Sequence, residues 1–116
     1  MKRLIALCFT VIFLFTSCSD EKKVYGVWYN EANGIRNVIQ FSESADGESA
    51  FIWAVYDIEK DETTSISKGY FKADNKQIVF TFIDNDSELI LDYSINDNVL
   101  TLSSKTSKMI LEKYEL

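Results

Sequence analysis

Short apolar stretches separated by turn residues follow one another from Val24 onward, and β-branched and aromatic side chains dominate them. Apolar and polar positions alternate in several stretches, as where Leu100 and Leu102 flank Thr101. Such alternation is typical of antiparallel strands that bury one face and expose the other. The pattern predicts strands at Val24–Tyr29, Ile35–Phe41, Ser49–Ile58, Ile66–Lys72, Gln77–Ile83, Leu89–Ile95, Val99–Ser103 and Lys108–Tyr114.

Evenly spaced strands without a helical period indicate an all-β fold, either a barrel or a sandwich. We predict an antiparallel up-and-down β-barrel of about eight strands. The residues between the strands accept the left-handed backbone of tight hairpin turns. They are Asn33-Gly34, Asp46-Gly47, Asp74-Asn75, Asp84-Asn85-Asp86 and Asn96-Asp97-Asn98. A barrel of this size is filled by side chains or holds one small ligand, and we expect side chains to fill it.

One stretch, Phe51–Tyr56, is apolar at every position and therefore on both faces of its strand. Two interpretations stay open. Either the N-terminal segment or a loop covers the outer side of this strand, or the outer side is an exposed apolar patch. Soluble proteins usually keep such a patch for a partner or a ligand.

The N-terminus has the pattern of a targeting signal. Lys2 and Arg3 precede Leu4–Phe15, a mainly apolar run of twelve residues. As a helix, this run reaches only about 18 Å, well short of the about 30 Å of a bilayer core. We therefore predict a signal peptide at residues 1–17 rather than a membrane span.

The end of this run, Phe15-Thr16-Ser17-Cys18, resembles the lipobox of bacterial lipoproteins, in the looser form common in Bacteroidota. The resemblance implies cleavage before Cys18 and a diacylglyceryl group, with acyl chains such as palmitate, in thioether linkage to its sulfur. It divides the chain into the signal, a lipidated tether at 18–23 and a domain at 24–116. It implies anchoring in the outer membrane, on the periplasmic or the cell-surface face. Asp20-Glu21 resembles the acidic tether of surface-exposed lipoproteins.

Short motifs spread over the domain resemble small lipocalin-like domains of bacterial lipoproteins. Gly26-Val27-Trp28 opens the first strand, Gly69-Tyr70-Phe71 lies in the middle, and Ile110-Leu111-Glu112-Lys113 lies in the last hairpin. The resemblance implies that Trp28 plugs one end of the barrel. It also implies that a basic residue of the last strand, which we take to be Lys113, covers Trp28. It favours a binding scaffold over an enzyme.

The amino-acid composition further restricts which catalytic, metal-binding and nucleic-acid-binding functions are open to the chain. The chain has no His, which excludes Ser-His and Cys-His catalytic pairs and imidazole metal ligands. Loss of Lys2 and Arg3 with the signal lowers the net charge from −6 to −8, which argues against nucleic-acid binding. We expect no metal, cofactor or catalytic residue. Acidic residues at strand ends and at 84–88 are interpreted as solubilising groups and turn residues.

Three functional hypotheses stay open. The first is a membrane-anchored, non-enzymatic module that binds a small apolar ligand, a glycan or a protein. The second is a protein inhibitor or immunity protein directed at lysozyme or a secreted cysteine protease, acting through the loops at 30–34 or 60–65. The third is an accessory subunit of an envelope complex. The sequence leaves the ligand and the oligomeric state open. The candidate binding residues are Trp28, Phe51, Trp53, Tyr56 and Tyr70, beside lipidated Cys18.

Overall fold

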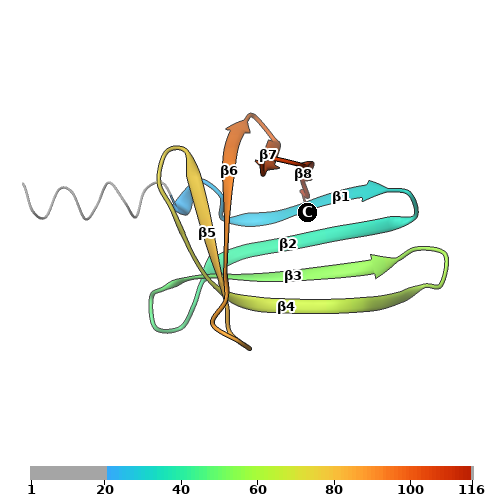
Figure 1. The fold of residues 1–116 in the computed structure, drawn as a ribbon, viewed down its shortest axis with the longest axis horizontal. Helices are drawn as coiled ribbons and strands as arrows, with labels where there is room; N and C mark the ends of the chain where they lie inside the picture. The colour runs from blue at the N-terminus through green and yellow to red at the C-terminus, as the bar shows by residue number, and fades with distance from the viewer. Residues whose placement is uncertain (1–20, 116) are drawn as a thin grey trace, which may run out of the picture.

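The computed structural model describes residues 21–115, so the predicted signal peptide and Cys18 lie outside the described residues. Each strand pairs antiparallel with the next, and the last pairs with the first, which closes a barrel (Figure 1). The predicted up-and-down barrel, consistent with a lipocalin-like fold, is confirmed. The strands are β1 (Gly26–Ala32), β2 (Ile35–Glu43), β3 (Ser49–Asp57), β4 (Glu62–Ala73), β5 (Gln77–Phe82), β6 (Glu88–Asn96), β7 (Val99–Ser103) and β8 (Lys108–Lys113).

The predicted turns join these strands as hairpins. Asn33, Asp86 and Asp97 adopt left-handed backbone with φ of 56°, 57° and 57°, a conformation that Asn and Asp tolerate better than most residues. In the β4–β5 turn, Asp74 Oδ1 accepts hydrogen bonds from the backbone N–H of Gln77 at 2.7 Å and of Lys76 at 2.8 Å. These two bonds favour the carboxylate and hold the pKa of Asp74 below its usual 3.8.

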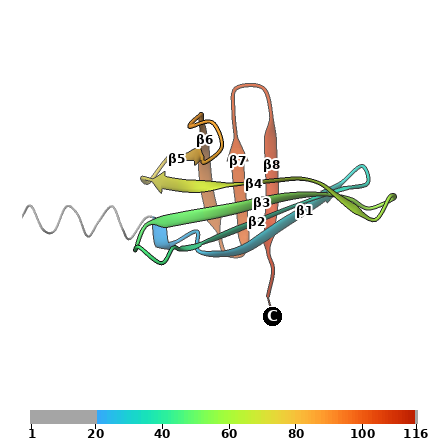
Figure 2. The ribbon, with the colours of Figure 1, turned by 90° about the horizontal axis from the view of Figure 1, so that it is seen from below.

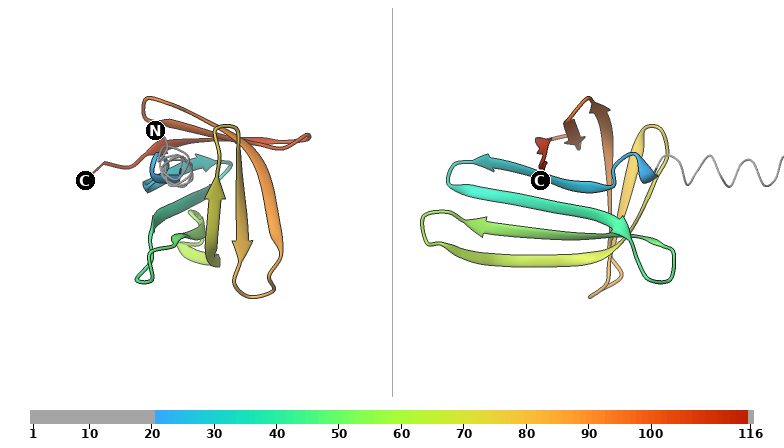
Figure 3. Two further views of the ribbon diagram at one scale, coloured as in Figure 1. Left: turned by 90° about the vertical axis from the view of Figure 1, so that its left-hand side faces the viewer. Right: turned by 180° about the vertical axis from the view of Figure 1, so that it is seen from behind.

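Strands β1 to β4 continue beyond the barrel as a four-stranded sheet (Figure 2). β1 pairs with β8 only at Trp28 and Tyr29, and β4 pairs with β5 only from Gly69 to Ala73. The remaining parts of β1 and β4 pair with β2 and β3 alone, so the two hairpins project from the barrel. The view from the opposite end shows the strands around a common interior (Figure 3, left).

The loops expected at 30–34 and 60–65 are therefore mostly strand, and this part of the sequence interpretation is wrong. β1 extends to Ala32, and β4 already begins at Glu62. The segment from Glu62 to Ser67 carries no apolar alternation, because both of its faces are polar or open to water. Pairing with β3 makes it a strand. The correction shortens the loops on which the inhibitor hypothesis depended.

Aromatic rings fill the barrel, as expected. Phe41 and Phe71 have ring centroids 4.9 Å apart, and so do Phe51 and Phe80. Both pairs meet edge to face, a favourable arrangement for aromatic quadrupoles. Aliphatic side chains from β2, β5, β7 and β8 complete this core: Ile39, Ile78, Leu100, Leu102 and Leu111.

Trp28 and Lys113 meet, as the resemblance to lipocalin-like domains implied. Trp28 is 1% exposed, and its Nε1 donates a hydrogen bond to the Val24 carbonyl at 2.8 Å. Lys113 Nζ lies 5.4 Å from the centroid of the Trp28 ring, a cation–π contact. A Cβ at Gly26 would lie 2.9 Å from Lys113 Cε, and Gly26 has a φ of +132°, so this position requires glycine.

The first described residues are held against the barrel by hydrogen bonds. Ser49 Oγ donates to Glu21 Oε1 at 3.1 Å and lies 2.8 Å from Tyr25 Oη. The Ala73 backbone N–H donates to Glu21 Oε2 at 3.4 Å. The hydrogen-bonded body of the domain thus includes Glu21, only three positions after Cys18.

Substitution of Gly69 tests how closely β4 and β5 approach each other where the barrel closes. A Cβ at Gly69 would lie 1.9 Å from the Thr81 carbonyl oxygen, which is backbone of β5 and cannot move aside without disturbing the ladder. We expect Gly69→Ala to lower the free energy of unfolding by about 3 kcal/mol, measured by urea denaturation.

Gly47→Ala is the matched control. Gly47 has a φ of +89°, but no atom lies within 4 Å of the place where its Cβ would stand, so only backbone strain of about 1 kcal/mol is expected. Equal losses in the two variants would contradict the close approach at Gly69.

Candidate functional site

A cleft opens where the projecting sheet leaves the barrel. It has a volume of about 240 Å³, and we call it the inner cleft. Its lining comes from β2, β3 and β4 on one side and from the ends of β5 and β6 on the other. The lining residues are Asn37, Trp53, Val55, Ser65, Ser67, Phe82 and Leu89.

The strand register explains why these residues meet. Side chains alternate along a strand, and Asn37 shares the inward phase of β2 with the buried Ile39 and Phe41. Ser65 and Ser67 share the inward phase of β4 with Phe71. The inner cleft thus continues the inward surface that forms the core inside the barrel, with polar side chains at three of its positions.

Trp53 is the aromatic residue at the centre of this site. Its side chain is partly buried, and its ring centroid lies 5.7 Å from that of Phe80 in the core. Its Nε1 donates a hydrogen bond to Asn37 Oδ1 at 3.0 Å. Packing on one side and this bond on the other hold the indole in one orientation.

The other candidate residues lie elsewhere. Trp28 and Phe51 are each 1% exposed and belong to the core, so neither presents surface to a ligand. Tyr56 lies on the outer face of β3, where the Arg36 guanidinium carbon sits 5.6 Å from its ring centroid. Tyr70 is 37% exposed.

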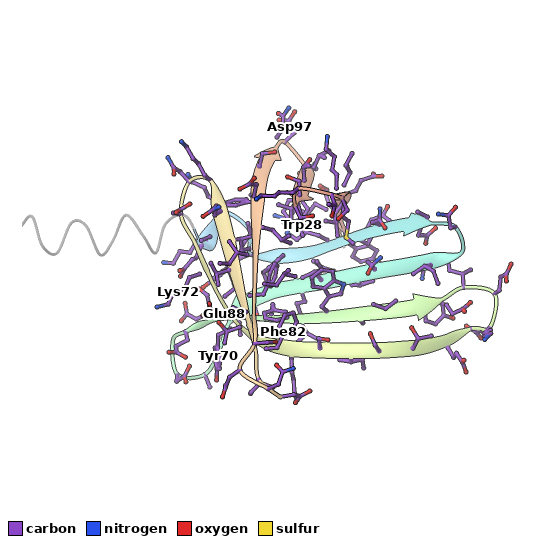
Figure 4. All side chains as sticks on the ribbon, in the orientation of Figure 1. Trp28, Tyr70, Lys72, Phe82, Glu88 and Asp97 are labelled. Atoms are coloured by element: carbon purple, nitrogen blue, oxygen red, sulfur yellow. The ribbon has the colours of Figure 1, made fainter. Side chains whose placement is uncertain are left out.

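Tyr70 borders a different, outward-facing depression. This depression has a volume of about 480 Å³, and Lys72 and Glu88 also line it (Figure 4). Of the five candidate binding residues, only Trp53 therefore lines the inner cleft. Sequence reasoning missed Asn37, Ser65 and Ser67. Asn37 could have been found from its polarity at a position whose strand phase is otherwise apolar, between Ile35 and Ile39. The segment around Ser65 and Ser67 has no such apolar phase and gave no signal.

The outer side of the Phe51–Tyr56 strand is open in the part of the chain that the structure describes. Ile52 is 44% exposed, and Ile66 on the neighbouring strand is 63% exposed. Ala54 pairs with Ile66 on one side and with Val38 on the other, so an apolar row crosses three strands. This arrangement favours the second interpretation of the stretch, an exposed apolar patch.

The chemistry that the inner cleft offers is stacking and hydrogen bonding by neutral groups. None of its seven lining side chains is ionisable. Within residues 21–115, no group of three or more His, Cys, Asp or Glu side chains is placed to hold a metal ion. Among the same residues, no helix is long and apolar enough to cross a membrane.

Comparisons of the chain with protein-family models, with curated proteins and with solved structures found no match.

The hydrogen bond between Asn37 and Trp53 is open to a direct test. Asn37→Ala removes the acceptor of the indole N–H, and we expect a loss of about 1 kcal/mol in the free energy of unfolding. We also expect a shifted Trp53 indole resonance in NMR spectra, because the ring loses its fixed partner.

Gln40→Ala on the exposed outer face of the same strand is the control, with an expected change below about 0.5 kcal/mol. If Asn37→Ala left both the stability and the Trp53 resonance as in Gln40→Ala, the bond would not hold the indole.

Proposed function

We propose that this protein is a lipid-anchored, non-enzymatic binding module of the cell envelope, whose ligand occupies the inner cleft. The observation that carries the proposal is the contrast between the two parts of the inward surface. Inside the barrel it is filled with aromatic rings, whereas beyond the barrel it opens into a cleft around a half-buried Trp53. A concave site with an aromatic wall and a few placed polar groups is the usual form of a ligand site.

The position of the tether supports the anchored part of the proposal. The first described residues lie at the end of the barrel opposite to the tips of the β1–β2 and β3–β4 hairpins (Figure 1). Three residues span at most about 11 Å, so acyl chains on Cys18 would keep Glu21 close to the lipid headgroups. The projecting hairpins and the inner cleft between them and the barrel would then point away from the membrane.

Charge supports the same arrangement. A mature chain of net charge −8 is repelled by anionic headgroups, so the anchor rather than the protein surface supplies membrane affinity. Two or three acyl chains anchor a protein far more firmly than one, which binds only marginally.

Substitution of Cys18 tests the anchor. We expect Cys18→Ala to abolish acyl addition, to leave the signal uncleaved at this position and to remove the acyl mass in mass spectrometry of the purified protein. Cys8→Ala, which changes the other cysteine of the chain, should keep the acylated mass. An unacylated Cys18 in the unsubstituted protein would overturn the anchored part of the proposal.

Native mass spectrometry tests the binding part. The protein isolated from its own envelope should carry a non-covalent adduct that is lost in Trp53→Ala, because this substitution removes the aromatic wall of the cleft. Ile52→Ala, on the outer face of the same strand, should retain the adduct. An adduct that depends on Ile52 instead of Trp53 would place the ligand on the outer face and overturn the assignment to the cleft.

A further inference from the structure

The inner cleft has two unlike walls. Phe82 and Leu89, from β5 and β6, form an apolar wall. The opposite side is the inner face of the projecting sheet, where Asn37 of β2 and the two serines Ser65 and Ser67 of β4 flank Trp53 and Val55 of β3. We call this side the polar wall, after its three hydrogen-bonding side chains. A ligand that satisfies both walls must itself combine an apolar face with a rim of hydrogen-bonding groups.

The polar wall has unused hydrogen-bonding capacity. The Asn37 side-chain oxygen is engaged by the Trp53 indole, which leaves the Asn37 amide N–H groups for other partners. Neither Ser65 nor Ser67 makes a side-chain hydrogen bond to any other residue within 21–115. Two hydroxyls and one amide group thus face the cleft ready to bind a ligand.

Charge and polarity then exclude most ligand classes. A charged ligand would meet no opposite charge in this cleft, since every lining side chain is neutral. A wholly apolar ligand would cover the two hydroxyls and the amide and leave them without hydrogen-bond partners, which is unfavourable. An uncharged molecule with hydroxyls around an apolar face avoids both penalties.

The volume of the inner cleft and the fixed orientation of the Trp53 indole narrow the class of ligand further. The cleft, at about 240 Å³, is smaller than the about 300–1,000 Å³ typical of sites for drug-sized ligands. It suits one ring at a time, with further rings continuing into solvent. The fixed Trp53 indole offers a ready stacking surface, so little side-chain entropy is lost on binding.

We propose that the inner cleft binds an uncharged pyranose ring of a glycan, with the C–H face of the sugar against the aromatic side and its hydroxyls on Asn37, Ser65 and Ser67. This inference rests on the proposed function and names the ligand class for the same cleft. The protein would thereby hold a glycan on the side of the barrel that faces away from its anchor.

NMR of the full-length protein in detergent micelles tests the ligand class. The probes are methyl β-D-glucopyranoside, methyl α-D-mannopyranoside and N-acetylglucosamine, each at about 50 mM, because a single ring is expected to bind with about millimolar Kd. The chain has two Trp residues, so Trp53→Phe assigns its indole signal. We expect at least one pyranoside to shift the Trp53 signal and leave that of buried Trp28 unchanged.

Variants on the polar wall locate the sugar. The double variant Ser65→Val and Ser67→Val should weaken pyranoside binding about tenfold, since two hydrogen bonds to the ligand are lost. Ser94→Val, on the outward face of β6, should bind as the unsubstituted protein does. The amide spectrum of each variant verifies its fold, and Asn37→Ala provides a second, single-site reduction of the polar wall.

The neutral apolar dye N-phenyl-1-naphthylamine separates failure of this inference from failure of the proposed function. Dye binding that depends on Trp53, without a response to any pyranoside, would overturn the sugar class while the cleft kept its role as a ligand site. Pyranoside binding unaffected by the double Ser variant would also overturn the inference. Absence of both responses, together with absence of an adduct in native mass spectrometry, would overturn the proposed function as well.

Discussion

The close approach of β4 and β5 at Gly69 is the constraint on which the rest of the structure depends. Gly69 is the first residue of β4 that pairs with β5, and the Thr81 carbonyl occupies the space where a Cβ would stand. Before Gly69, β4 pairs with β3 alone among the described strands, and from Gly69 onward it also pairs with β5 as a barrel strand. This contact therefore separates the filled core from the projecting sheet.

The inward-facing positions of β4 serve two purposes, one on each side of Gly69. On the barrel side, Phe71 and its partners exclude water and supply the packing energy that a domain without a disulfide requires. On the projecting side, Ser65 and Ser67 occupy equivalent positions and leave room for a ligand. A site built on paired strands holds its groups more precisely than one built on loops.

The proposed anchor and the proposed site fit one geometry. Glu21 accepts hydrogen bonds from Ser49 and from the β4 backbone, so the proposed anchor at Cys18 would lie three positions from the hydrogen-bonded domain. The hairpins extend from the opposite end (Figure 3, right). A ligand site there stays accessible to large molecules that do not approach the bilayer closely. The apolar row on the outer face, with Ile66 the most exposed member, offers a separate surface.

The sequence by itself determined the strands, their order and most of the turns. Alternation of apolar residues and turn-forming Asn, Asp and Gly are local signals, and an up-and-down barrel pairs neighbours in the chain. The contact between Lys113 and Trp28 was also predictable, through the resemblance of the Gly-x-Trp motif. Trp53 was identified as a candidate because its strand is apolar on both faces, a feature visible without coordinates.

Only the tertiary structure decided where the barrel ends and what the inner cleft contains. Asn37, Ser65 and Ser67 lie far apart in the chain from Phe82 and Leu89, and their meeting depends on how many residues each pair of strands shares. The start of β4 was misjudged because the polar segment from Glu62 to Ser65 has no buried face to mark it. Its strand conformation comes from hairpin pairing with β3, which the apolar pattern of the segment itself does not encode.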